Sequence, residues 1–281
     1  MPDDSFRDLT ARVIEATRPY LERGLVALYA HGSHAGGEVD GWSDLDVCYI
    51  HHESEESLRA YREWMGEMHD RFEYVVDPVG APLEQLGEGG HWSFAFLRDG
   101  LLRGATLLLG EDIRHLVSPP SEHLMRLSVL YTSLTWVRRL YEVPRWEPLP
   151  ESLEGLTPQP LEAWEHGNAA WQAYMAVIQL LRAIVLLEMG VFCEGRREIL
   201  NALQERGEEA AGLMEEALQV RAELPRFEEV ERASPGVAKL LAAIPDLGER
   251  LFVDMARDGL ADPTYEGPGG PYYAPDGSRR E

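Results

Sequence analysis

The sequence predicts an α/β (α+β) domain with a mixed sheet, followed by an all-α helical bundle. Two observations lead to this fold class. As far as about residue 118, short apolar runs with strand-like alternation lie between segments with helical periodicity. From residue 121, apolar residues recur at helical spacing through several long segments. We therefore expect one domain over residues 1–118, a bundle over 119–260, and a flexible tail rich in Gly and Pro over 261–281.

The first domain is expected to begin with a helix and then to combine strands and helices. Leu9, Val13 and Ile14 recur at helical spacing, which predicts a helix over residues 5–18. The elements expected next are a strand over 25–33, a strand over 44–52, a helix over 55–72 and a strand over 72–78 that proline stops. Residues 94–110 predict another strand, a turn at Asp99-Gly100 and further structure ending at Gly110.

The second domain is expected to contain only helices. The apolar periods predict helices over 121–141, 161–189, 196–205, 207–224 and 235–255. A proline-rich connector over 143–160 separates the first two of them.

The charge of the chain narrows the classes of partner. Lys and Arg number 26 and Asp and Glu number 49, which gives a formal net charge of −23. A protein this acidic repels nucleic-acid phosphates, so we expect no nucleic-acid partner and favour a small cationic molecule. Solubility, or adaptation to salt or heat, explains the same charge equally well.

Three further features bear on location. No apolar run approaches the length of a membrane span, and the first residues are acidic where a signal peptide is basic and then apolar. The two cysteines, Cys48 and Cys193, are too few for a disulfide framework. We expect a cytoplasmic protein that does not bind membranes and that is a monomer or a homodimer.

The stretch most informative about chemistry is His31-Gly32-Ser33, followed after ten residues by Asp44-Leu45-Asp46. A strand ending in a tight turn at Gly32 and Ser33 exposes backbone N–H groups and a hydroxyl, which suit a phosphate. Asp44 and Asp46 are two apart on the next expected strand, so their carboxylates share one face. Mg²⁺ prefers such oxygens and relieves their repulsion. The pattern predicts phosphoryl or nucleotidyl transfer with two Mg²⁺ ions; the alternative is a strand that merely faces water.

The stretch HGSHAGGEVDGWSDLDVCYI resembles the DNA polymerase β superfamily of nucleotidyltransferases, whose pattern is G-S-x(9–13)-D-x-D. The resemblance implies a nucleotidyltransferase domain, ATP as co-substrate and a third carboxylate on a later strand. Glu73 and Asp77 are the two candidates for that carboxylate in the stretch FEYVVDP.

More narrowly, the chain resembles the aminoglycoside adenylyltransferases that modify streptomycin and spectinomycin. Their third acid lies in an L-E-V-T strand, which FEYVV resembles, so the resemblance favours Glu73 as metal ligand and base. It also implies that Arg182 and Arg196 reach the triphosphate, with Arg197 as a neighbour that could substitute, and that Trp92 faces the acceptor.

Each of these further assignments has a simpler alternative. Arg182 lies among leucines, so its stem also suits an apolar surface with the guanidinium in water. Trp92 also suits ordinary packing. The family places an acid early in a bundle helix to grip the antibiotic, where this chain has Gln172; Glu162 or Glu165 could stand in.

Together these features predict transfer of AMP from ATP to a hydroxyl of a small cationic acceptor, most simply an aminoglycoside. Glu73, Asp44 and Asp46 would be the catalytic residues, and Gly32, Ser33, Arg182 and Arg196 would contact the nucleotide. The alternatives are AMP transfer to a protein acceptor, as in antitoxin-like nucleotidyltransferases, and a regulatory protein that binds nucleotide without turnover.

Overall fold

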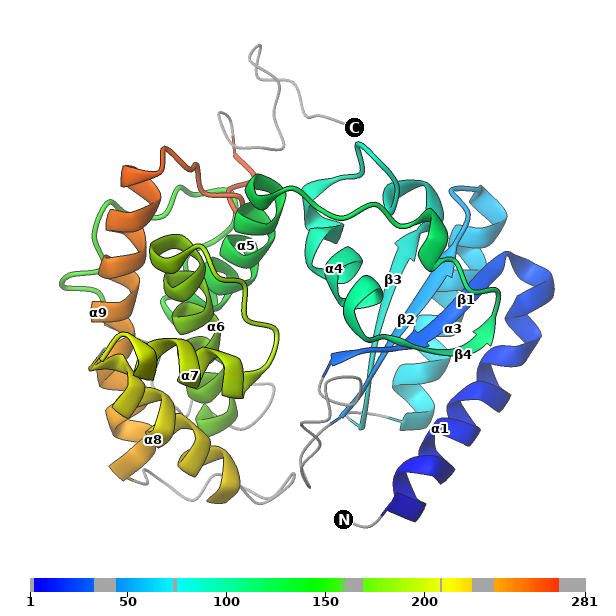
Figure 1. The fold of residues 1–281 in the computed structure, drawn as a ribbon, viewed down its shortest axis with the longest axis horizontal. Helices are drawn as coiled ribbons and strands as arrows, with labels where there is room; N and C mark the ends of the chain where they lie inside the picture. The colour runs from blue at the N-terminus through cyan, green and yellow to red at the C-terminus, as the bar shows by residue number, and fades with distance from the viewer. Residues whose placement is uncertain are drawn as a thin grey trace. The chain divides into compact units, whose positions relative to one another are not determined.

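The structure, a computed structural model, describes residues 3–32, 44–72, 75–157, 159, 169–207, 209–223 and 235–267. The chain divides into two compact units, Met1–Met125 and Arg126–Glu281 (Figure 1).

The first unit is built on a four-stranded sheet with the strand order β3-β2-β1-β4. Its helices and strands are α1 (Asp3–Thr17), β1 (Leu25–Ala30), β2 (Leu45–His51), α3 (Glu55–Phe72), β3 (Val76–Pro82), α4 (Ala95–Arg103) and β4 (Thr106–Gly110). Short 3-10 helices occupy Arg18–Arg23, Leu83–Gln85, Trp92–Phe94 and Arg114–Leu116. β1 pairs antiparallel with β2 and β4, whereas β2 pairs parallel with β3. The mixed sheet predicted from the sequence is confirmed.

Each face of the sheet has its own apolar core, and helices lie on both sides (Figure 1). One core joins side chains of α1 and α3 to Leu28, Val47 and other alternate strand residues. The opposite core contains Tyr29, Cys48 and Ala81 from the strands, together with Leu101 of α4. Strand residues alternate between the two faces, which fixes where every polar side chain at a strand end must point.

The strand predicted over 72–78 is wrong in its bounds, because α3 extends through Phe72 and β3 starts only at Val76. Phe72 completes the buried helical face that also contains Ser57, Ala60, Trp64 and Met68. Proline does not stop β3, which continues through Pro78 to Pro82. β3 is an edge strand, so a backbone N–H is not needed on its outer side.

The strand and turn predicted from residue 94 are also wrong, because residues Ala95–Arg103 form the helix α4. Its buried residues Ala95, Arg98 and Leu101 recur at helical spacing. Asp99 and Arg103 form an i,i+4 ion pair of 2.6 Å, and Gly100 lies inside the helix instead of in a turn. Only the final part of this stretch, β4, is a strand.

The second unit is helical, as predicted. Its helices are α5 (Glu122–Leu140), which begins shortly before the unit boundary, α6 (Ala169–Met189), α7 (Arg196–Glu205), α8 (Ala210–Glu223) and α9 (Pro235–Arg257). α6 packs against α7, α8 and α9. The predicted start of α6 at residue 161 lies outside the described residues.

The segment Ala170–Met189 of α6 is the one described helix that is long and apolar enough to cross a membrane by length and composition. In this protein 89% of its most apolar window is buried. Burial of this extent is the ordinary condition of a central helix in a bundle.

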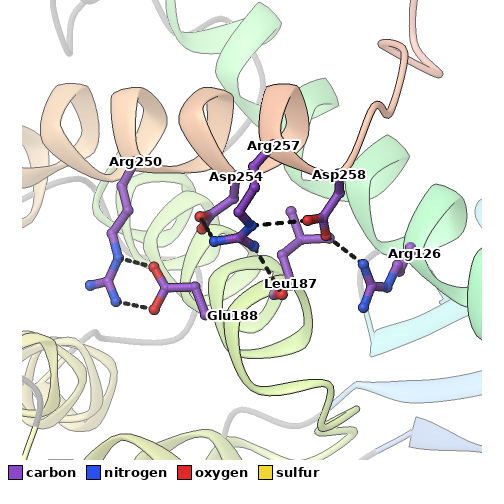
Figure 2. A network of polar contacts seen from close by, with 7 residues as sticks. All are labelled: Arg126, Leu187, Glu188, Arg250, Asp254, Arg257 and Asp258. Carbon is purple, nitrogen blue, oxygen red and sulfur yellow. Dashed lines mark hydrogen bonds and ion pairs between the residues drawn. The ribbon is translucent and has the colours of Figure 1, made fainter.

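Seven residues form a polar network that joins α6, α9 and the start of α5: Arg126, Leu187, Glu188, Arg250, Asp254, Arg257 and Asp258 (Figure 2). Arg250 binds both carboxylate oxygens of Glu188 at 2.5 Å, and Arg257 donates to Asp254 at 2.8 Å. Burial raises the pKa of Asp254, and the neighbouring charge of Glu188 adds to the rise. Folding therefore favours the protonated form of Asp254 over the ionised form.

The first residues of the predicted tail are fixed to α5. Arg138, which is 3% exposed, donates from Nη2 to Asp262 at 2.6 Å and from Nε to Thr264 at 2.5 Å. Arg145 forms a 3.1 Å ion pair with Glu266. The rest of the tail, residues 268–281, lies outside the described residues.

Candidate active site

Two carboxylates stand at the start of β2. Asp46 is the second residue of this strand, and Asp44 is the residue immediately before the strand begins. Cys48, further along β2, points into the core on the α4 side of the sheet. Since alternate strand residues share a face, Asp44 and Asp46 lie on that side too. One oxygen of each carboxylate lies within 4.8 Å of the other, as the shared face predicted from their spacing requires.

The third carboxylate near them belongs to Asp77 on β3. The parallel pairing of β2 with β3 sets Asp77 directly beside Asp46. Asp44, Asp46 and Asp77 each offer one oxygen, and all three oxygens lie within 4.8 Å of one another. Among the described residues, these three form a group able to hold a metal ion.

Glu73, the acid favoured from the sequence, lies outside the described residues. That preference rested on the likeness of FEYVV, read as part of a strand over 72–78, to the L-E-V-T strand of the family. Because β3 starts at Val76, Asp77 is the acid that the strand carries. The role of Glu73 stays a prediction.

The electrostatics of this group favour a bound cation. Two ionised carboxylates at such separations repel by about 3 kcal/mol at an effective dielectric near 20, before further screening by solvent. Burial raises the pKa of Asp77 to about 6, and the charge of Asp44 adds to the rise. The surface area of Asp77 nevertheless makes it an exposed residue, which limits the effect of burial on its pKa and lets a ligand reach its carboxylate. A divalent cation would reverse the repulsive part of this shift.

Gly32 lies directly against Asp46. Its φ is +67°, in the left-handed region that favours glycine. A Cβ atom built at this position would lie 2.0 Å from Asp46 Oδ2. Glycine is therefore required both by the backbone and by the carboxylate beside it. Ser33, its predicted partner in phosphate binding, lies outside the described residues.

Arg182 makes contacts that the sequence did not reveal. The residue is 8% exposed, and its guanidinium donates to the carbonyl oxygens of Cys193 at 3.0 Å and Glu194 at 2.8 Å. It also donates to Gln179 Oε1 at 2.6 Å. Arg182 thus ties α6 to the segment that leads into α7.

Arg196 is the first residue of α7, and its Nη1 lies 3.4 Å from the hydroxyl of Tyr174 on α6. A cation is disfavoured at a helix N-terminus, where the helix dipole is positive. An anion bound there would offset this conflict.

Trp92 opens a 3-10 helix just before α4, and its ring centroid lies 5.0 Å from that of His91. Both residues belong to the first unit. The predicted contact of Trp92 with an acceptor stays a prediction.

No protein-family model matches the sequence, and no match is found among curated proteins. Among solved structures, the chain is similar to the spectinomycin adenyltransferase AAD(9) from Enterococcus faecialis, solved with ATP and spectinomycin. The TM-score is 0.55 and the identity 13%, over 86% of this chain and 98% of that one. The chain has a nucleotidyltransferase fold. At this identity the likeness shows the fold alone.

A toxin–antitoxin structure with AMP-PNP also matches, with 18% identity over 46% of this chain and 91% of that one. Its TM-score of 0.28 is too low to carry an argument. Because a nucleotidyltransferase fold does not by itself fix an activity, the function has to be argued from the three carboxylates.

Proposed function

We propose that the protein transfers AMP from ATP to a hydroxyl group of a small acceptor, with Mg²⁺ held by Asp44, Asp46 and Asp77. The observation that carries the proposal is the group of three carboxylate oxygens within 4.8 Å on a nucleotidyltransferase fold. Carboxylate oxygens are the hard ligands that Mg²⁺ prefers, so the residues present fit this ion. When bound, two Mg²⁺ ions would neutralise charge on the phosphates and on the attacking and leaving oxygens.

The residues of the chain have distinct roles in this proposal. Asp44, Asp46 and Asp77 hold the metal ions, and the backbone at Gly32 lets the nucleotide phosphates approach. Asp77 accepts the proton of the acceptor hydroxyl, since its carboxylate stands beside Asp46 and is exposed to an incoming acceptor. The hydroxyl oxygen then bonds to the α-phosphorus of ATP, the bond to the bridging oxygen breaks, and pyrophosphate leaves.

Further residues are proposed to contact the two substrates. Arg196 binds the triphosphate of ATP, and Arg182 positions the segment before Arg196 through its backbone contacts. Trp92 contacts the acceptor. The net charge of −23 supports a cationic acceptor, and an aminoglycoside has this chemistry. Cys48 and Cys193 are both buried and are not joined in a disulfide, in keeping with the proposed cytoplasmic location.

The decisive experiment incubates the protein with Mg²⁺, α-labelled ATP and a panel of aminoglycosides, and measures labelled product and pyrophosphate. Asp46→Asn is expected to abolish product formation. Asp77→Asn should slow it by a factor on the order of 10²–10⁴, the contribution of a positioned base. Asp70→Asn, which removes an exposed charge from α3, is the matched control and should retain activity.

The competing assignment is tested in the same assay. If Glu73→Gln lowers the rate by this factor and Asp77→Asn does not, Glu73 is the base, as first inferred from the sequence. Wild-type turnover in Asp46→Asn would refute the metal assignment altogether. Label on protein and none on the aminoglycosides would contradict the small acceptor.

A further inference from the structure

His31 extends the row of carboxylates by one strand. It follows the last residue of β1, and its backbone N–H donates to the carbonyl oxygen of Asp46 at 3.0 Å. The pairing of β1 with β2 therefore continues beyond Ala30 and sets His31 opposite Asp46. Tyr29, two residues earlier, points into the core on the α4 side. By strand alternation His31 shares this face with Asp46 and Asp77.

The imidazole of His31 carries a polar atom that lacks a partner. Its Nε2 is buried and makes no hydrogen bond among the residues that the structure describes. Leaving a buried polar atom unpaired is unfavourable, so such an atom calls for an explanation. A histidine ring carries a proton on at least one of its two nitrogens, so Nε2 can serve as a hydrogen-bond donor.

The carboxylate of Asp46 lies on the side toward β1. Its Oδ2 stands over Gly32, the residue that follows His31. Side chains directly opposite one another on paired antiparallel strands have Cβ atoms about 5 Å apart. The backbone register therefore places the side chains of His31 and Asp46 opposite one another on one face of the sheet.

We propose that His31 is a positioning residue, whose Nε2–H donates to the Asp46 carboxylate when a divalent cation is bound at Asp44, Asp46 and Asp77. The inference rests on the proposed function, because it requires the cation site. A ligand carboxylate oriented by a neighbouring N–H donor holds its metal more tightly than a freely rotating one.

Two substitutions separate this role from simple packing. His31→Gln keeps an N–H group near the position of Nε2, whereas His31→Leu keeps bulk and removes every polar atom. Mn²⁺, which has the same oxygen preference as Mg²⁺, can be titrated by electron paramagnetic resonance without any turnover. We expect His31→Leu to lose about 10- to 100-fold in Mn²⁺ affinity and His31→Gln to retain most of it.

Thermal unfolding without metal provides the second readout. Because leucine removes an unpaired buried polar atom, the melting temperature of His31→Leu should be no lower than that of the wild type. If His31 served only in packing, His31→Leu would not weaken Mn²⁺ binding while keeping its full thermal stability.

The outcomes distinguish this inference from the proposed function. Wild-type Mn²⁺ affinity in His31→Leu, or equal losses in His31→Leu and His31→Gln, would overturn the positioning role while leaving the proposed function intact. Wild-type Mn²⁺ affinity in Asp46→Asn would instead overturn the cation site, and the role of His31 with it.

Discussion

Replacing Gly32 by alanine tests the geometry of the site with a single methyl group. Gly32 has a φ of +67°, and Gly190, at the end of α6, has a φ of +66°. A Cβ at Gly190 meets no atom within 4 Å, whereas a Cβ at Gly32 lies 2.0 Å from Asp46 Oδ2. The two substitutions therefore share the backbone strain, and they differ in the collision with Asp46.

The size of each effect follows from these values. A left-handed conformation is unfavourable for alanine by about 1–2 kcal/mol, which lowers a melting temperature by about 2–8 °C in a protein of this size. Ordinary contact with a Cβ begins at 3.4 Å, so Asp46 Oδ2 must move from 2.0 to 3.4 Å, that is by about 1.4 Å. Mg²⁺ tolerates little departure from its ligand distances, and a misplacement of about 1 Å lowers turnover by about 10².

The assay compares AMP transfer, Mn²⁺ affinity and thermal unfolding for Gly32→Ala and Gly190→Ala. We expect similar losses of melting temperature in both variants, with loss of transfer and cation affinity only in Gly32→Ala. Full cation affinity in Gly32→Ala would refute the reasoning, because it would mean that Asp46 can leave its position without harm to the site.

Three further predictions concern the second unit. Because folding raises the pKa of Asp254, the stability that its protonated form contributes is present at low pH and is lost as the pH rises. The melting temperature of Asp254→Asn, measured relative to that of the wild type, should therefore rise as the pH is raised from 4 to 8. A difference that stays constant over this range would contradict the prediction. Arg182→Met should lower the free energy of unfolding by about 3 kcal/mol, measured in urea, because it leaves the carbonyl of Cys193 and its other acceptors unpaired. Arg196→Ala should weaken ATP binding, measured by calorimetry, whereas Arg197→Ala should not. Equal losses of ATP affinity in the two variants would mean that only the loss of one positive charge matters, and not the position of Arg196.

The sequence predicted that Asp44 and Asp46 lie close together, because the contacts that decide this are local. Asp44 and Asp46 are two residues apart on a strand, and that spacing alone puts them on one face. The helices over 55–72 and 196–205 were predicted at their observed bounds, since their buried faces repeat at helical spacing.

The third carboxylate could not be decided from the sequence, because it depends on where α3 gives way to β3. Phe72 fits a strand pattern, but it is fixed by packing on the buried face of α3. A boundary shift of a few residues changes which acid stands beside Asp46. The contacts of Arg182 were missed for a related reason: its acceptors lie beyond the end of α6, and no periodicity encodes such a pairing.

The edge position of β3 has a consequence for association between copies of the protein. A sheet grows by pairing at a bare edge, which requires N–H donors along that edge. Pro78 and Pro82 have none. This edge is a poor template for another strand. If the protein forms a homodimer, we expect its subunits to meet elsewhere than along β3, and the strand that carries Asp77 then stays accessible to substrate.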